Sequence, residues 1–168
     1  MLKVGSLFTG IKAFEKAMLN IDLDFKVEFS SEWDIYPAVA GNQIHNNGQT
    51  INFPSEEKMK EYLLQFTWSK NGKKACDEGY IKRMKGNKLK GVYQAQIQSD
   101  NLGDIRDLIN MELPEVDMIV HGSPCQDFSL SGNNKGGDEG SGTRSSLMWH
   151  TVEIINDLNP KYVLWENV

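Results

Sequence analysis

The sequence has 168 residues, of which 39% are hydrophobic and 24% charged, and its net charge is -5. This length and composition predict one globular domain with a sizeable core and exclude two ordinary domains. No apolar run approaches the length of a membrane span, and the first residues lead into a strand without the pattern of a signal peptide, so we expect a cytoplasmic protein. The two cysteines and three histidines lack the spacing of a disulfide framework or a zinc site, so we expect no metal.

The charge is distributed unevenly along the chain. Residues 58–90 contain ten bases and three acids, a net charge of +7, which leaves -12 for the rest of the chain. Two interpretations stay open for this basic segment: contact with a phosphate backbone, or a solvated and partly mobile insertion.

The first ninety residues begin with an alternation of strands and helices. Residues 3–8 are predicted as a strand, Thr9-Gly10 as a tight turn, 11–19 as a helix, 24–30 as a second strand and 35–45 as a second helix. An acid, Glu32, follows the second strand, as in nucleotide-binding βαβ units where that acid binds ribose hydroxyls. The glycine pattern at Gly10 is incomplete, so an ordinary turn between strand and helix is the alternative.

The segment from about residue 48 to 98 is predicted as an insertion into the sheet. Its first helix begins after Ser55, which is followed by two acids in the first turn. The remainder is basic and interrupted by glycines, and no element is assigned there. Its aromatic side chains Trp68, Tyr80 and Tyr93 either stack on nucleic-acid bases or form a small core under a long loop.

The second half of the chain places a cysteine at the end of a predicted strand. Residues 116–120 form an apolar run that leads into Pro124-Cys125, so the thiol lies where open α/β sheets bind ligands. Cys125 is therefore either a nucleophile or a packed core residue. A glycine-rich stretch follows at 132–142, interpreted as a lid or a connection, then a helix at 143–158 and a strand at 161–165. The alternation predicts an α/β fold with a doubly wound, mainly parallel sheet covered on both faces.

Five segments, taken in order, resemble the motifs of DNA (cytosine-5)-methyltransferases. They are Leu7-Phe8-Thr9-Gly10-Ile11, Ser31-Glu32-Trp33-Asp34, Gly103-Asp104-Ile105, Gly122-Ser123-Pro124-Cys125-Gln126-Asp127-Phe128-Ser129 and Trp165-Glu166-Asn167-Val168. The segment 142–147 is similar to the phage and prophage branch of that family. The resemblance implies a Rossmann-like fold that binds S-adenosylmethionine, with S-adenosylhomocysteine as the product.

The resemblance also implies the residues of the cofactor site. Glu32 is expected to bind the ribose hydroxyls, Trp33 to pack on adenine, and Asp104 to accept a hydrogen bond from the adenine amino group. The full expected set is Phe8, Thr9, Gly10, Ile11, Glu32, Trp33, Asp104, Ile105, Pro124 and Leu147. A lysine at position 12 stands where the family usually has a second glycine, and it either crowds the cofactor or caps its carboxylate.

The implied catalytic residues are Cys125, Glu166, Pro124 and Asn167. By resemblance, the Cys125 thiolate adds to C6 of cytosine in double-stranded DNA, and Glu166 hydrogen-bonds N3 and the exocyclic amine. Pro124 fixes the backbone of the loop and Asn167 positions it. A base in a duplex has to be flipped out to reach such a pocket.

The family continues beyond Glu-Asn-Val with further strands and a target-recognition domain. We therefore expect residues 1–168 to be the N-terminal part of the catalytic domain, truncated after the strand that ends in Glu166. We expect this part to be inactive alone and to need a missing C-terminal part or a second polypeptide, in a bacterial or phage-infected cell. Restriction-modification and phage protection are both open as its role.

Three other functions remain as alternatives. One is methylation of cytosine C5 in tRNA, and another is a non-catalytic fragment that only binds the cofactor. The third is a cysteine hydrolase, for which only His121 or His150 could supply the base beside Cys125.

Overall fold

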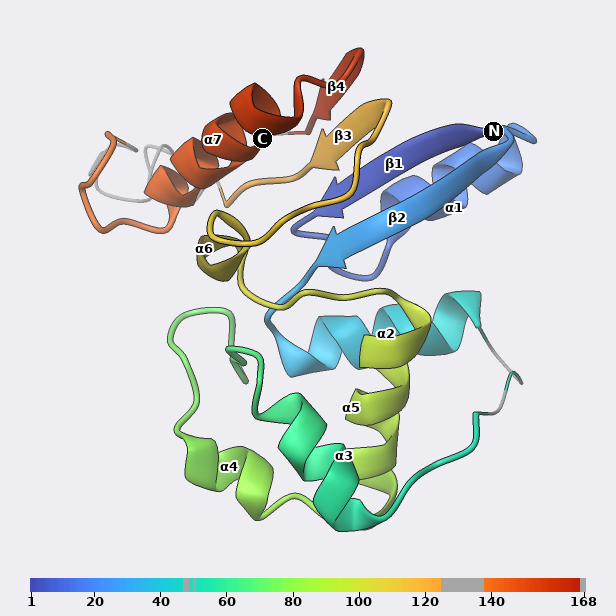
Figure 1. Ribbon diagram of the computed structural model, residues 1–168, viewed down its shortest axis with the longest axis vertical. Helices are drawn as coiled ribbons and strands as arrows, with labels where there is room; N and C mark the ends of the chain where they lie inside the picture. Colours follow the sequence, from blue (N-terminus) through green and yellow to red (C-terminus); the bar gives the residue numbers. More distant parts are fainter. Residues whose placement is uncertain (47–48, 50, 125–137, 167–168) are drawn as a thin grey trace.

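The protein is a four-stranded parallel sheet with helices on both faces, attached to a layer of helices (Figure 1). This computed structural model describes residues 1–46, 49, 51–124 and 138–166. The strands are β1 (Leu2–Leu7), β2 (Phe25–Ser31), β3 (Met118–His121) and β4 (Tyr162–Trp165), in the order β2-β1-β3-β4. The predicted α/β fold with a parallel, Rossmann-like sheet is therefore confirmed.

Helices cover both faces of the sheet, as a doubly wound fold requires. On one face, α6 (Ile105–Leu108) and α7 (Met148–Leu158) bury Leu108 and Ile154 against Leu7, Phe29 and Ile119. On the other face, α1 (Ala13–Asn20) buries Met18 against strand side chains. Because successive strand residues point to opposite faces, the two apolar sets of β1 supply both cores.

The segment predicted as an insertion folds into helices that pack on α2 (Ile35–His45). These are α3 (Glu56–Leu63), α4 (Glu78–Lys82) and α5 (Gly86–Gln98), which form the lower layer in Figure 1. Trp68 is 2% exposed among their apolar side chains, and its Nε1 donates to the Leu63 carbonyl at 2.9 Å. Tyr80 lies at the edge of this core, where the ammonium groups of Lys70 and Lys88 approach its ring.

Two boundaries differ from the sequence prediction for local reasons. Helix α1 begins at Ala13 rather than residue 11, because Lys12 adopts a left-handed conformation with a φ of 63°. The helix predicted at 143–158 begins instead with a short 3-10 turn, η2 (Ser145–Leu147), held by bonds from Ser146 to Thr143.

Strand β4 lies at one edge of the sheet. Its four side chains, Tyr162 to Trp165, are between 43% and 59% exposed. This strand carries Glu166 at its carboxyl end, so the predicted proton donor lies at the rim of the described structure. Among the described helices, none has both the length and the apolar character needed to cross a bilayer.

Candidate active site

The residues predicted for the site gather where the four parallel strands end. The Thr9 amide donates to the Ser31 carbonyl at 3.1 Å, which joins the ends of β1 and β2. The Glu166 amide donates to the His121 carbonyl at 2.9 Å, which joins the ends of β3 and β4. Parallel strands present their carboxyl ends on one edge, and that edge is where open α/β sheets bind ligands.

Glu32 is held at this edge by backbone amides. Its Oε2 accepts from the Gly10 amide at 2.8 Å and its Oε1 accepts from the Asp34 amide at 2.7 Å. Partial burial raises the pKa of Glu32 above its usual value, although these amide hydrogen bonds oppose the change. The carboxylate therefore connects the turn after β1 with the end of β2.

Asn101 is a positioning residue that the sequence motifs did not reveal. Its Oδ1 accepts from the Glu32 amide at 2.8 Å, and its Nδ2 donates to the Glu32 carbonyl at 2.9 Å and to Gln96 at 2.8 Å. The side chain is 4% exposed, so these bonds replace water. Asn101 thereby fixes the backbone that carries Glu32 and Trp33. Its place two residues before Gly103-Asp104 is the only sequence signal for this role.

Asp104 and Trp33 meet through a side chain that was not predicted for the site, Arg106. Asp104 is 3% exposed and caps α6 by accepting from the Arg106 amide at 3.0 Å. The Arg106 guanidinium donates to both Asp104 oxygens, through Nε at 2.9 Å and through Nη2. The guanidinium carbon also lies 5.0 Å from the centre of the Trp33 ring. The two groups expected to bind adenine therefore share one cationic partner.

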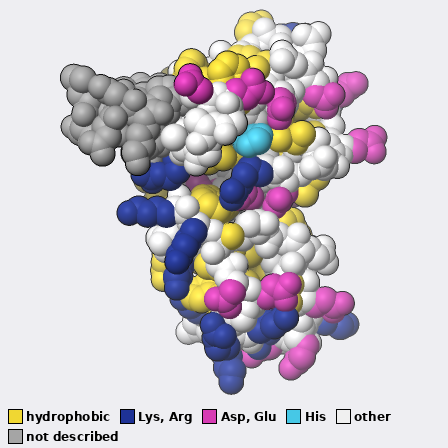
Figure 2. Space-filling view, turned by 90° about the vertical axis from the view of Figure 1, so that its left-hand side faces the viewer, with side chains coloured by type: hydrophobic (Ala, Val, Ile, Leu, Met, Phe, Trp, Pro, Cys, Tyr) yellow, Lys and Arg dark blue, Asp and Glu magenta, His cyan; other side chains and the backbone are white. Residues whose placement is uncertain are grey.

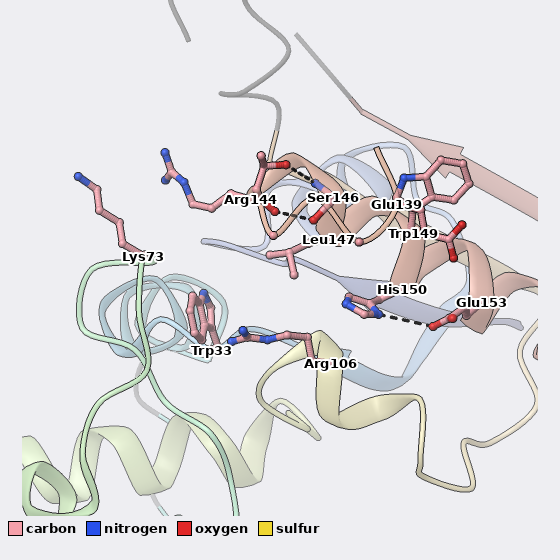
Figure 3. Close-up of a pocket in the computed structure, with 13 residues that line it drawn as sticks. Trp33, Lys73, Arg106, Glu139, Arg144, Ser146, Leu147, Trp149, His150 and Glu153 are labelled. Carbon is pink, nitrogen blue, oxygen red and sulfur yellow. Dashed lines mark hydrogen bonds and ion pairs between the residues drawn. The ribbon is translucent and has the colours of Figure 1, made fainter. Parts of the chain in front are cut away.

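A cavity of about 310 Å³ opens beside this group (Figure 3). Trp33 and Arg106 line one side, and Leu147 reaches toward them from η2 on the other. The lining also includes four charged side chains: Lys73, Glu139, Arg144 and Glu153. Of the expected cofactor residues, Trp33 and Leu147 thus border the same space.

A second cavity, of about 470 Å³, lies among Phe8, Thr9, Gly122 and Glu166. Phe8 and Gly10 both have positive φ, 53° and 54°, and a Cβ on Gly10 would meet no atom within 4 Å. A ligand can therefore approach the Gly10 backbone closely. Glu166 is exposed, so the described residues do not provide the burial that proton donation at neutral pH favours.

The remaining predicted residues are placed as follows. Ile105 is 3% exposed inside the sheet core, whereas Ile11 is 51% exposed before α1. Pro124 is half-buried and follows Ser123, whose Oγ accepts from the Trp165 indole at 3.2 Å. Cys125 and Asn167 lie outside the described residues.

The Lys12 side chain reaches the residue that follows helix α5. Its ammonium donates to the Ser99 hydroxyl at 2.7 Å, beside Glu15 and Asp100. Burial lowers the pKa of Lys12, and the two carboxylates partly oppose this change. The side chain lines neither of the cavities that hold Trp33 and Phe8.

His121 is a weak general base at neutral pH. Burial lowers the pKa of His121 to about 4, and its ring stacks on Trp165 with centroids 5.6 Å apart. His150 lies on α7, with its Nδ1 3.5 Å from Glu153. A histidine with such a low pKa accepts protons weakly at neutral pH, which disfavours a hydrolase built on His121.

Comparison with known proteins identifies the class to which this fold and site belong. Residues 68–168 match the family model described as C-5 cytosine-specific DNA methylase, which is more than half of the chain. The chain therefore belongs to the C-5 cytosine-specific DNA methylase family.

Individual relatives match along almost the whole chain. The orphan methyltransferase M.SssI of Spiroplasma monobiae is 39% identical over 99% of this chain and 46% of the relative. The type II methyltransferase M2.ScrFI of Lactococcus lactis subsp. cremoris is 32% identical over 100% of this chain and 47% of the relative. The orphan methyltransferase M.SPRI of Bacillus phage SPR is 29% identical over 99% of this chain and 26% of the relative. The chain thus spans half or less of the length of these relatives.

Proposed function

We propose that this chain carries the cofactor site and the nucleophile of an enzyme that methylates C5 of cytosine in double-stranded DNA. The observation that carries the proposal is the meeting of Glu32, Trp33 and Asp104 with the ends of β1 and β4 at one edge of the sheet. The family match supports the same reaction class.

The described residues fit S-adenosylmethionine as the methyl donor. Glu32 offers carboxylate oxygens to ribose hydroxyls, Asp104 offers an acceptor to the adenine amine, and Trp33 offers an aromatic face. The open backbone at Gly10 admits a ligand beside Phe8. When bound, the cofactor supplies an electrophilic methyl group on a sulfonium centre.

Within this proposal, Cys125 and Glu166 act on the cytosine ring. The Cys125 thiolate forms a bond to C6 while Glu166 gives a proton to N3, so that the electron density of the ring moves to C5. C5 then accepts the methyl group. Loss of the C5 proton to a base and release of the thiolate restore the 5,6 double bond, and N3 returns its proton to Glu166. Burial of the Glu166 carboxyl by further protein or by DNA would favour its protonated form.

The basic side chains lie on the face that DNA would meet. Figure 2 shows a band of lysine and arginine side chains that continues from the site onto the helical layer. Lys73 and Arg144 both line the cavity beside Trp33. We expect them to contact phosphates, since lysine and arginine contacts dominate binding to the DNA backbone.

We also propose that residues 1–168 alone have little or no methyltransferase activity. Glu166 and the whole of β4 lie exposed at the sheet edge, and the chain spans about half the length of its relatives. The test supplies the part of M.SssI that this chain does not match as a second polypeptide. Labelled methyl should pass from S-adenosylmethionine to DNA only in the mixture.

Variants and substrates then separate the alternatives. Cys125→Ser in the mixture should abolish turnover, and unchanged turnover would remove Cys125 from the mechanism. Methylation of tRNA in place of duplex DNA would favour the tRNA alternative. Ordinary enzyme rates from the isolated chain would refute its proposed inactivity.

A further inference from the structure

Arg106 contacts both of the side chains, Asp104 and Trp33, that bind adenine in the proposed function. It donates to the two Asp104 oxygens and lies over the Trp33 ring, 5.0 Å from its centre. Its own side chain is 46% exposed, whereas that of Asp104 is 4% exposed. The buried carboxylate thus faces solvent only through the guanidinium.

The guanidinium resembles adenine in the features that this site can recognise. Both are planar, both present N–H donors along an edge, and both stack on aromatic rings. Asp104 also accepts from the Arg106 amide at 3.0 Å, so a third donor group has little room on the carboxylate. Arginine and adenine therefore compete for the same acceptor and the same ring.

We propose that Arg106 fills the adenine position when the cofactor is absent, and that cofactor binding displaces it. This inference rests on the proposed cofactor site. Arg106 already lines the neighbouring cavity of about 310 Å³, so a rotation of its side chain can carry the guanidinium along the cavity wall and away from Trp33. Glu139 and Glu153 line that cavity and offer carboxylates to the guanidinium, so the displaced arginine keeps an ionic partner.

If adenine has to displace Arg106, removal of this side chain should raise the affinity for adenosine compounds. Removing Arg106 leaves the buried Asp104 carboxylate short of a donor, which the adenine amine then supplies. An ion pair between a half-exposed arginine and a buried carboxylate, together with a cation–π contact, is worth roughly a fivefold to twentyfold change in affinity. A side chain that merely supported the site would change affinity in the opposite direction.

Calorimetric titration with S-adenosylhomocysteine tests this, because the product has no net charge and needs no DNA. Arg106→Ala should bind it about tenfold more tightly than the natural chain. Arg106→Met keeps an unbranched apolar stem without donors and should show the same gain, so it serves as the second variant where the alanine variant folds poorly. Lys82→Ala removes an exposed cation on α4 that lines neither cavity, so its affinity should stay within roughly twofold.

Salt provides a second measurement. Added salt weakens the Arg106–Asp104 ion pair, so the natural chain should bind S-adenosylhomocysteine more tightly as salt rises, and Arg106→Ala should not. Equal or weaker binding by both arginine variants would refute the displacement while leaving the cofactor site intact. Absence of binding by every protein would instead refute the cofactor site, and the inference with it.

Discussion

Protonation of His121 is expected to destabilise the folded chain at mildly acidic pH. Its ring is 5% exposed, and its Nδ1 has no hydrogen-bond partner within the described part of the chain. Burial lowers the pKa of His121 from 6.5 to about 4. As the pH falls below 6.5, the unfolded chain takes up a proton that the folded chain excludes. His121 thus makes its full contribution above pH 6.5 and progressively loses it down to about pH 4.

The size of the effect follows from the two pKa values. At 1.36 kcal/mol for each pH unit, lowering the pH from 7 to 4.5 should cost about 2 kcal/mol of unfolding free energy at this residue. Urea unfolding followed by circular dichroism measures that free energy at each pH. Carboxylates add their own pH dependence to every variant, so the informative quantity is the difference between the natural chain and His121→Phe.

A buried neighbour that does not titrate provides the matched control. Val120 precedes His121 on β3 and is 5% exposed, so Val120→Ala should lower the unfolding free energy by the same amount at every pH, to within about 0.5 kcal/mol. His121→Phe should instead lose about 2 kcal/mol of the pH dependence of the natural chain. Parallel curves for the natural chain and His121→Phe would refute the assignment of a buried, neutral histidine.

Three further substitutions test the positioning of the site and the packing of the helical layer. Asn101→Ala removes the buried bonds that hold the Glu32 backbone, so urea unfolding should show a loss of about 2 to 4 kcal/mol, and a loss below about 1 would contradict this role. Trp68→Ala should cost about 3 to 5 kcal/mol because its ring is 2% exposed, whereas a stability change near zero would argue that the ring is free to stack on bases. Glu32→Gln replaces one of the two accepting oxygens by a donor and should bind S-adenosylhomocysteine at least about tenfold more weakly by calorimetry, with circular dichroism checking its fold; unchanged affinity would exclude a ribose contact.

The parts of the fold that the sequence predicted well carry local signals. Helix α2 was predicted at residues 35–45 and runs from Ile35 to His45, because Asp34 caps it by accepting from the Tyr36 amide. Helix α5 was not assigned, since it begins at a glycine, contains Gly91 and has no capping side chain. Its apolar positions become meaningful only when α2 and α3 pack against them.

The candidate site shows the same difference between residues with a local sequence signal and residues whose role depends on long-range contacts. The motifs revealed Glu32, Trp33 and Asp104, because each follows the end of a strand or caps a helix. Asn101 and Arg106 were missed, since their roles depend on folded contacts. Asn101 bonds to Glu32 across 69 residues of sequence, and Arg106 lies over Trp33 from a different element. Long-range contacts of this kind have no periodicity that a single sequence displays.

The most direct test of the proposed reaction is covalent capture on a DNA duplex containing 5-fluorocytosine. Fluorine at C5 cannot leave as a proton does, so the bond between the nucleophile and C6 should persist after methyl transfer. With S-adenosylmethionine and the complementary part of M.SssI, mass spectrometry should find a methylated DNA adduct on the peptide containing Cys125 and none with Cys125→Ser. An adduct on another residue, or none in a mixture that methylates ordinary DNA, would contradict the account.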